Sequence, residues 1–570
     1  MTQPYFYNTA PISVINFSDP LETQCANILA ATQQQFRNEQ ALRKQHPLVR
    51  LWDAEWNLQF LCSVEYTATF TWISNDTGPG RLEIPFATPV AQWIYNEPGR
   101  MAAGQGRTVC VTVDYCGARW SGIMDKCAVE QREDMDVVLV VDFMHDYEHV
   151  KWYSCWSNPF LPAAFQFPRA FLIAGPTDWA LKMILFVNIV REHNPLITFP
   201  DDPLDLTSWF TDLDMATWPF VVAPGSFVTA MASGVIWALP ITRWANWHDM
   251  AHQPLEDAEM SVTMTRYLPG DPPPWDGAVL RYGTLVMDIV DKSGVYVGTS
   301  YGGTIFDGLA RTFVQFGEDF IESSTVLATD TTVPPEYYQG QTKLTMKQLP
   351  YVVFREGINS PIQTSAWINS PAKGVQVNCG GHSMPGVNEA ISATIQAGFD
   401  MLGELVFVGS LGSTVDTMLK PLYEDTVLAW WSVKNSGRAL DTGWERLFEY
   451  FQQGANKAYT IASLMVLRAG FWATKTTVSW KVEVMDGLPF MIGQRGLGNF
   501  FLDDRIGLVL MGDPNIHMDR CRKLDLTWDD SAFASWNLTV GDERIFQDPA
   551  QRAWGKVEQL IAGLRDLGVY

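Results

Sequence analysis

The segment GWERLFEYFQQGANKAYTIASLMVLRAGFWATKT (443–476) carries the most regular apolar pattern of the chain. Its apolar residues recur at alternating steps of four and three, a spacing that places them on one face of a helix. Thr442 and Glu445 are typical of a capping box, and Gly470 is typical of a helix end. The sequence therefore predicts a helix over 443–469 that buries this face in a core or a subunit interface, beginning with Trp444, Phe448 and Phe451.

Composition limits the classes of protein to which the chain can belong. Its 570 residues are too many for one core, and 47% apolar residues with 23 Trp are typical of globular domains. Tryptophan in such numbers serves interfaces as well as cores. The net charge of −23 disfavours a specific nucleic-acid binder, which requires basic patches. We expect three or four globular domains.

Cysteine usage and the N-terminal segment bear on the compartment and on metal binding. The eight cysteines contain no CxxC pair, so the sequence predicts neither a zinc ribbon nor a thioredoxin-type site. MTQPYFYNTAPIS lacks the basic and apolar regions of a signal peptide, and the apolar run 179–190 is too short to cross a bilayer. We expect a protein that is made in a cytoplasm, is released by lysis and holds no cofactor or metal.

Strand-like and helix-like patterns alternate along the chain and predict a mixed α+β fold of several domains. A helix is expected from Asp19-Pro20 to about residue 44, and a second one over 175–194. β-Branched and aromatic residues predict strands between them, including a three-strand meander. The expected regions are a β-rich domain with a leading helix (1–172), a middle α+β domain (173–325), an extended arm or connection (326–379), a second α+β domain with the long helix (380–547), and a C-terminal helix (548–570).

One segment matches the nucleophile elbow of hydrolases. Gly298-Thr299-Ser300-Tyr301-Gly302 has the GxSxG pattern between an expected strand and an expected helix. His382 or His517 is available as a histidine partner, but no complete triad can be assembled from the sequence. Nearby glycines also fit a turn-rich structural segment, which is the interpretation that we favour.

A histidine pair, His145 and His149, has the HxxEH spacing of one class of zinc protease. That chemistry needs both rings on one helix face, whereas the flanking residues are typical of a strand. Along a strand the two residues would lie about 13 Å apart, too far for one zinc ion to bridge.

A second pair, His248 and His252, has the HExxH spacing with Asp249 in place of the usual glutamate. Pro254 is expected to end any local helix at once. The shorter aspartate would hold its carboxylate farther from a metal-bound water. Further candidate ligands are Glu256 and Glu259, but we favour histidines without a metal and expect no hydrolase activity.

Long blocks around the predicted helix resemble a known family. They are GGHSMPGVNE (380–389), PLYEDTVLAW (421–430), GWERLFEYF (443–451) and KAYTIASLMVLRAGFWAT (457–474). In these blocks the chain is similar to the minor tail proteins of long-tailed phages of actinobacteria, mycobacteriophages above all. The resemblance covers about residues 49–540. It implies a structural virion protein in the tail-hub position at the tail tip, and not an enzyme.

The same resemblance implies an architecture and partners. Tail-hub-like domains are β-rich barrels or sheets with interspersed helices. A homo-oligomer, expected to be a trimer, would close the tail tube and contact the distal tail ring protein, the tape measure protein and other minor tail proteins. Roles in adsorption to the bacterial cell surface and in DNA delivery are also implied. The excess of 63 Asp and Glu over 40 Lys and Arg would repel DNA that passes through a lumen, or keep the subunit soluble.

Two other functions stay open at this point. One is a carbohydrate-binding adhesin, suggested by tryptophan pairs such as Trp430 with Trp431 and Trp244 with Trp247. The other is a cell-wall hydrolase that uses the histidine motifs. As interface candidates we take Trp444, Phe448, Phe451, Trp430 and Trp431.

Overall fold

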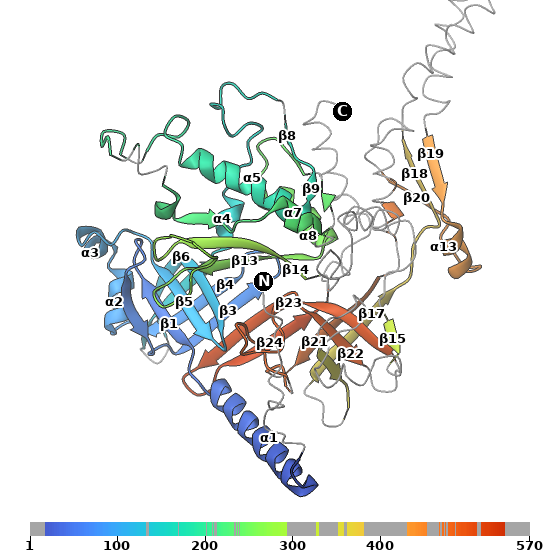
Figure 1. Ribbon diagram of the computed structural model, residues 1–570, viewed down its shortest axis with the longest axis horizontal. Coiled ribbons are helices and arrows are strands. Elements are labelled where there is room, and N and C mark those ends of the chain that lie inside the picture. Colours follow the sequence, from blue (N-terminus) through green and yellow to red (C-terminus); the bar gives the residue numbers. More distant parts are fainter. Residues whose placement is uncertain are drawn as a thin grey trace, which may run out of the picture. The chain divides into compact units, whose positions relative to one another are not determined.

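The computed structural model describes most of five stretches of the chain, 18–292, 327–329, 352–380, 430–452 and 467–541 (Figure 1). The chain divides into two compact units. Unit 1 comprises Met1–Leu309, Val326–Trp367 and Trp480–Asp542, and unit 2 comprises Ala310–Thr325, Ile368–Ser479 and Glu543–Tyr570. Within the five stretches, the residues that are not described are 133–135, 169, 201, 208, 210–213, 233–234, 236, 239, 358–361, 468–469, 472–473, 475–476, 485, 489 and 510–514.

Unit 1 is built on a twelve-stranded sheet in the order β16-β22-β23-β3-β4-β7-β6-β5-β1-β2, with β15 and β24 each paired to β23. The antiparallel run β5-β6-β7 confirms the predicted meander. The strands are β1 (Leu48–Trp52), β2 (Leu58–Cys62), β3 (Thr67–Ile73), β4 (Pro79–Pro85), β5 (Cys110–Tyr115), β6 (Ala118–Gln131), β7 (Val137–His145), β15 (Leu327–Thr329), β16 (Val352–Arg355), β22 (Arg505–Val509), β23 (Asn515–Asp529) and β24 (Ser535–Val540).

This sheet joins strands from opposite ends of the chain. β23 pairs with β3 in antiparallel register, with Leu524 opposite Trp72 and Leu526 opposite Phe70. All four side chains are buried, so the pairing places them in one core. The regions expected from the sequence follow the chain in order, whereas this sheet draws on the first, the third and the fourth of them.

The sheet curls around its own buried face. Tyr115 on β5 and Trp536 on β24 are far apart in the strand order, yet their ring centroids lie 5.9 Å apart. In the same core Trp120 is fully buried and donates from Nε1 to the carbonyl of Thr71 at 2.8 Å. The strand order is nevertheless an open path, so the described strands form curled sheets and no closed barrel. The expectation of a mixed α+β fold is confirmed. Of the two expected β arrangements, barrels or sheets, the described strands form sheets.

A second part of unit 1 is a three-stranded sheet, β10-β14-β13, covered by helices. Helix α5 (Thr177–Glu192) confirms the helix predicted over 175–194. Its Leu181, Ile184 and Leu185 share a buried cluster with α8 and all three strands, so the helices supply the apolar cover that the sheet needs. The other elements of this part are α4 (Glu148–Lys151), β8 (Phe171–Leu172), β9 (Gly175–Pro176), η2 (Met215–Thr217), β10 (Phe220–Val222), α7 (Phe227–Ala232), β11 (Trp237–Ala238), β12 (Ile241–Thr242), α8 (Trp247–Asp257), β13 (Met260–Arg266) and β14 (Leu285–Asp291).

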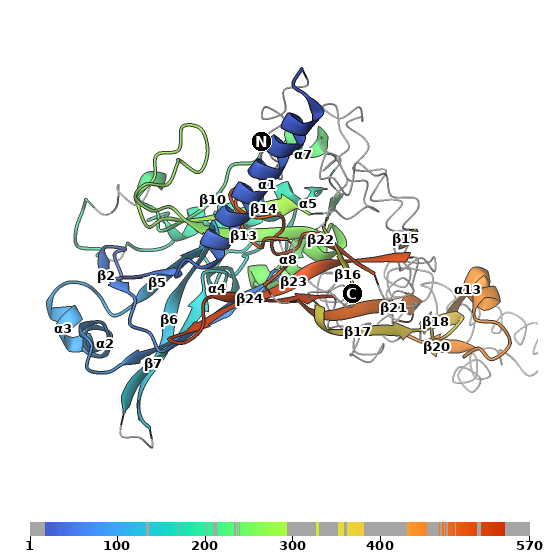
Figure 2. The same ribbon diagram turned by 90° about the horizontal axis from the view of Figure 1, so that it is seen from below.

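The first helix, α1 (Leu21–Arg43), confirms the prediction for the N-terminal region and runs away from the large sheet (Figures 1 and 2). Its C-terminal end is anchored because Arg43 pairs with Asp486 at 2.5 Å and donates to the carbonyl of Phe490 at 2.8 Å. Most of its length is exposed. Two short helices, α2 (Pro89–Tyr95) and α3 (Glu97–Ala102), follow β4.

The described part of unit 2 contains a small sheet, β19-β18-β20, a short helix, and further helical residues at 467, 470, 471 and 474. Its buried apolar cluster comprises Val377, Cys379, Leu467 and Phe471. The elements are β18 (Gln376–Gly380), β19 (Trp430–Lys434), α13 (Ser436–Asp441) and β20 (Glu449–Phe451). A separate two-stranded sheet is formed by β17 (Ile362–Ser370) and β21 (Thr477–Val484), of which residues 362–367 and 480–484 belong to unit 1.

The start of the long helix predicted over 443–469 is wrong. Thr442 caps the C-terminal end of α13 instead, and Gly443 follows with φ of 71°, the left-handed conformation that stops helices. The next residues leave helical geometry because the carbonyl of Phe448 accepts from the Val375 and Gln376 amides, and β20 pairs with β18. Of the rest of the predicted helix, Leu467 is helical, while 453–466 and 468–469 lie outside the described residues, as does the C-terminal helix expected over 548–570. Residues 470, 471 and 474 are helical as well, so the helix end predicted at Gly470 is wrong.

Among the residues that the structure describes, no helix combines the length and the apolar character needed to cross a bilayer.

Candidate functional site

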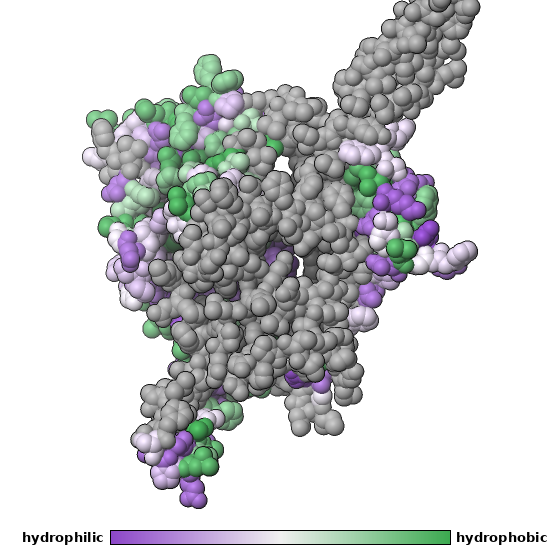
Figure 3. All heavy atoms as spheres, turned by 45° about the vertical axis from the view of Figure 1, so that its right-hand side comes forward, coloured by the Kyte–Doolittle hydropathy of each residue, from purple (hydrophilic) through white to green (hydrophobic). Residues whose placement is uncertain are grey.

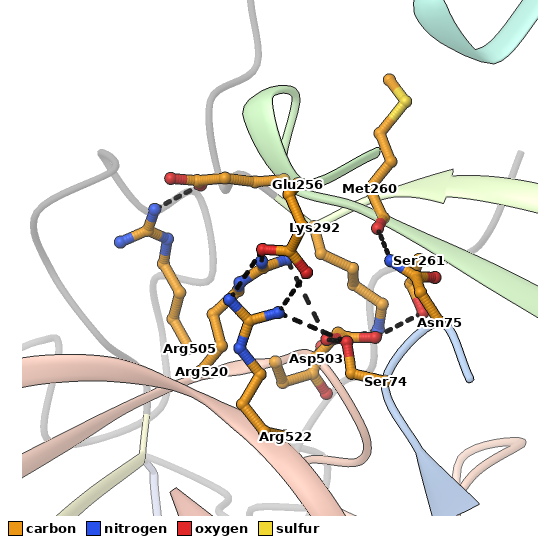
Figure 4. Close-up of polar contacts among 12 residues, drawn as sticks. Ser74, Asn75, Glu256, Met260, Ser261, Lys292, Asp503, Arg505, Arg520 and Arg522 are labelled. Atoms are coloured by element: carbon orange, nitrogen blue, oxygen red, sulfur yellow. Dashed lines mark hydrogen bonds and ion pairs between the residues drawn. The ribbon is translucent and has the colours of Figure 1, made fainter. Parts of the chain in front are cut away.

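A cluster of ion pairs and hydrogen bonds joins parts of unit 1 that are far apart in the sequence (Figure 4). Its residues come from the end of β3, from α8 and the start of β13, from the end of β14, and from β22 and β23. We call it the ion-pair cluster, and its members are Ser74, Asn75, Glu256, Glu259, Met260, Ser261, Lys292, Asp503, Asp504, Arg505, Arg520 and Arg522.

Glu256, on the last turn of α8, is held by two arginines of β23. Arg522 Nη1 donates to Oε1 at 2.7 Å and Arg522 Nη2 donates to Oε2 at 3.0 Å, a bidentate arrangement. Arg520 Nη2 donates to the same Oε2 at 3.1 Å. Two further ion pairs lie beside this one, Arg505 with Glu259 and Lys292 with Asp504.

Asp503 is fully buried, and hydroxyls from two different sheets satisfy its carboxylate. Ser74 Oγ donates to Oδ1 at 2.5 Å, and Ser261 Oγ donates to Oδ2 at 2.7 Å. Asn75 adds two bonds, since its Nδ2 donates to a β13 carbonyl and its Oδ1 accepts from a β13 amide, both at 2.8 Å. These contacts fix the three-stranded sheet against the large one.

The ion-pair cluster connects elements of unit 1 through mutually compensated charges. Its four cationic side chains face four carboxylates, so the charges of its members balance one another. Removing one member of such a buried pair usually costs about 3–5 kcal/mol. Sequence analysis missed it, although Arg520 and Arg522 at a spacing of two share one face of a strand.

The HxxEH motif lies at a chain turn and not along one strand, so the predicted strand context is wrong for its second half. His145 ends β7, and His149 lies in the short helix α4. Between them Asp146 is fully buried and accepts from Arg266 Nε and Nη2, each at 2.8 Å. Arg266 Nη2 also lies 3.2 Å from His149 Nε2, so that ring serves this buried pair.

The pKa of Asp146 reflects this pairing. Burial alone raises it, but the charge and hydrogen bonds of the Arg266 guanidinium lower it to about 2, with His149 and Ser121 helping. Burial also lowers the pKa of His145 to about 4. Asp146 therefore stays charged and His145 stays neutral at ordinary pH. Burial and the Arg266 pairing account for both states.

The second histidine motif lies on α8, which continues to Asp257, so the expectation that Pro254 ends the helix is wrong. Buried Trp247, Ala251 and Leu255 hold the helix in the core and offset the cost of an interior proline. The His248 and His252 ring centroids lie 5.7 Å apart, and His248 Nδ1 lies 3.0 Å from the Tyr147 hydroxyl.

The candidate metal ligands next to that motif, which we do not favour as a metal site, have other partners. Glu256 and Glu259 belong to the ion-pair cluster and bind arginines. In the described part of the chain, no three His, Cys, Asp or Glu side chains are grouped so that they could hold a metal ion. The GxSxG segment 298–302 and His382 lie outside the described residues, and His517 lies in β23.

The interface candidates taken from the sequence lie on the surface of unit 2. Trp444 is 95% exposed, Phe448 53%, Trp430 54% and Phe451 45%. Only Trp431 is half-buried, against the Val377 and Cys379 core. The alternative that Trp444, Phe448 and Phe451 pack into the core of their own chain is therefore wrong, because the helix that would have buried them does not form there. The interface alternative stays a prediction.

The second tryptophan pair is not an exposed pair. Trp247 is fully buried and donates from Nε1 to the carbonyl of Leu181 at 3.1 Å. Trp244 is 42% exposed and packs on Trp156, with ring centroids 4.3 Å apart. These residues are part of the packing of unit 1.

Unit 1 exposes apolar side chains that the sequence analysis missed. Hydrophobic residues, green in Figure 3, are exposed in patches among hydrophilic ones. Many belong to loops on either side of α5, where no periodic pattern marks them. In these loops Phe165, Phe167, Leu196, Phe199, Leu204 and Leu206 are each between 73% and 92% exposed.

Known proteins share this sequence over most of its length. Residues 48–542 match the family described as Siphovirus ReqiPepy6 Gp37-like protein. The chain is 30% identical to Minor tail protein Gp28 of Mycobacterium phage L5 and 30% identical to Minor tail protein Gp28 of Mycobacterium phage D29, covering 92% of this chain and 95% of each relative. A solved tail protein from Neisseria meningitidis MC58 is 8% identical over 89% of this chain and 99% of that one, with a TM-score of 0.37, which does not establish a shared fold.

Proposed function

We propose that this chain, which belongs to the Siphovirus ReqiPepy6 Gp37-like family of phage minor tail proteins, is a hub subunit at the tail tip. In this role it forms a homo-oligomer, expected to be a trimer, that closes the tail tube. It scaffolds neighbouring tail proteins, among them the distal tail ring and tape measure proteins. It also takes part in host adsorption and in DNA delivery.

The observation that carries this proposal is the amount of apolar side chain left on the surface of a well-packed chain. Soluble monomers rarely expose large apolar areas unless these bind something. In the described residues, α1 is the extended example, because Leu21, Leu29 and Phe36 along its 23 residues are 74%, 59% and 57% exposed. Such a helix gains stability when another subunit covers it. Trp444 supplies a second exposed anchor, of a residue type enriched at the centres of protein interfaces.

The charge of the chain fits the proposed place on the DNA path. With 63 acidic against 40 basic residues, a lumen lined by this protein would repel DNA during delivery. Solubility before assembly is the other use of the same charge. If an assembled structure had a neutral or basic lumen, repulsion of DNA would be ruled out, and solubility would be the remaining use of the acidic charge.

Assembly is the direct test of the surface in unit 2. Phage carrying Trp444→Ala are expected to yield few complete tails, because an exposed anchor of the interface is lost while the chain itself still folds. The matched control is Glu445→Ala in the same loop, which should assemble normally. Normal tails and infectivity with Trp444→Ala would remove this residue from the interface.

Stoichiometry tests the contribution of α1. Purified chain should have a mass near three times 64.1 kDa by light scattering, and a Leu29→Gln, Phe36→Gln variant should shift toward the monomer. Gold labelling of the chain in purified virions should mark the tail tip. A monomer at all concentrations, or a label along the tube, would contradict the proposal.

A further inference from the structure

The sheet β19-β18-β20 of unit 2 has two faces of different chemistry (Figure 1). Val377 and Cys379 of β18 point to the buried side and are fully covered. Alternate residues of a strand point to the opposite face, so Gln376, Asn378 and Gly380 lie on the other side. Residues of β19 and β20 alternate in the same way, exposed at every second position. We call the exposed side the open face.

Two aromatic rings meet on the open face. Trp430 of β19 lies opposite Gly380, and Phe451 of β20 lies opposite Asn378, on the two sides of β18. Because Gly380 has no side chain, nothing from the central strand separates the rings at that level. Their centroids are 5.7 Å apart with an angle of 62° between the planes. About half of each side chain stays accessible.

A row of polar side chains adjoins the rings. Glu449 Oε2 accepts from Asn378 Nδ2 at 2.9 Å and from Gln376 Nε2 at 3.4 Å. Gln376 Nε2 also lies 3.3 Å from Asn378 Oδ1. The three side chains orient one another, so their remaining donors and acceptors point outward in a fixed pattern. Alternate positions along a strand are about 6.6 Å apart, close to the width of one sugar ring.

We propose that the open face binds an uncharged saccharide. The C–H face of a sugar ring packs on Trp430 and Phe451, and the hydroxyls pair with Asn378, Gln376 and Glu449. Small-molecule sites in general combine apolar lining with a few fixed polar groups, and this arrangement meets that description. The inference deepens the proposed part in host adsorption, and rests on it, by naming the class of surface molecule that is recognised.

The same observations disfavour two other kinds of occupant. An apolar protein surface that covered the open face would remove water from the Gln376 and Asn378 amides and the Glu449 carboxylate. Their outward-facing atoms would then lack hydrogen-bond partners, at a cost of about 1–3 kcal/mol for each group. An anionic ligand would be repelled by Glu449. The positive charge of Lys434 on the same face balances that of Glu449 and leaves no net positive charge to attract an anion. Hydroxyls both donate and accept, so a neutral sugar satisfies every group of the row.

Binding to defined sugars is the first arm of the test. Titration calorimetry of the full chain uses maltohexaose, cellohexaose and chitohexaose, with a galacturonic acid hexamer as the anionic comparison. At least one neutral hexamer should bind more tightly than the anionic one. Trp430→Ala and Asn378→Ala should each weaken that binding about tenfold or more, while Trp430→Phe retains most of it. The matched control is Trp152→Ala, an exposed tryptophan of unit 1 that is 82% accessible.

Adsorption of whole virions is the second arm, and it applies whichever neutral sugar is recognised. Virions with Trp430→Ala should have normal tails but adsorb to host cells at a rate about tenfold lower, and periodate oxidation of the cell surface should abolish the difference. Wild-type adsorption by this variant overturns the inference and leaves the hub proposal standing. Loss of tails with intact sugar binding would show that the open face is a protein interface. If Trp430→Ala virions lacked tails while Trp444→Ala virions assembled normally, the result would count against Trp444 as the proposed assembly surface.

Discussion

In the large sheet of unit 1, Trp120 is fully buried, with its ring 4.9 Å from that of Phe70, whereas in unit 2 Trp444 is 95% exposed. The difference extends beyond single residues. The core of the large sheet gathers buried side chains from both ends of the chain, from Val49 to Val540. The apolar cluster among the described residues of unit 2 has four buried members.

This contrast separates two uses of apolar residues in one chain. Unit 1 buries apolar residues in the cores of its two larger sheets, although it also exposes some on α1 and in the loops on either side of α5. The described part of unit 2 keeps large rings outside, where they add nothing to its own core. These exposed rings are available to contact partners or ligands.

The largest effect is expected in the core of unit 1. Trp120→Ala removes a buried ring and leaves the Thr71 carbonyl without its donor, so the free energy of unfolding should fall by about 3–5 kcal/mol. Trp444→Ala should change it by less than about 0.5 kcal/mol, because the ring is in water before and after folding. Hydrogen exchange of β3 and β6 amides in the purified chain measures the first effect, and exchange of β18 amides in unit 2 measures the second. Equal effects of the two substitutions would break the contrast between the units.

Buried arginines give a finer comparison. Arg266→Met leaves the buried Asp146 carboxylate uncompensated and should cost about 3–5 kcal/mol. The double variant Asp146→Asn, Arg266→Met should recover part of this loss, since no charge then stays buried alone.

In unit 2, Arg438 is equally buried but donates to the carbonyls of Gly374 and Phe471 and to Thr474 Oγ1. Arg438→Met should cost less, about 1–3 kcal/mol, because neutral acceptors lose a donor. The loss of stability in each variant is measured by chemical denaturation, with hydrogen exchange of amides near the substituted arginine as the local probe. A larger loss for Arg438→Met would reverse the expected order.

Acid should weaken unit 1 through the same aspartate. The pKa of Asp146 is lowered to about 2 in the folded chain, below the ordinary value near 3.9. Its contribution is therefore present above about pH 4 and is lost as the pH falls from about 4 to 2, by about 2 kcal/mol in total. Unfolding midpoints measured across this window should fall less steeply for Asp146→Asn than for the wild type. Parallel curves would show that the pair does not set the acid limit.

Local patterns in the sequence determined much of this protein by themselves. The helices α1 and α5 and the meander β5-β6-β7 follow from residue type and periodicity, which depend on neighbours in the sequence. Neither helix has a side-chain N-cap, so the cap expected from Asp19 does not form. Long blocks of rare residues carried the resemblance to phage minor tail proteins, which the family membership confirms. Composition alone gave the acidic charge and the globular character.

Tertiary structure decided the rest, because the deciding partners are distant in sequence. The pattern after Gly443 fits a helix locally, yet a strand pairing with β18 takes the same backbone groups. Pro254 is tolerated since the faces around it are buried by other elements. The ion-pair cluster and the open face depend on strands that meet across up to hundreds of residues, and no local pattern records which carboxylate meets which arginine. Long-range pairing is set by the packing of whole sheets, and only the folded chain shows it.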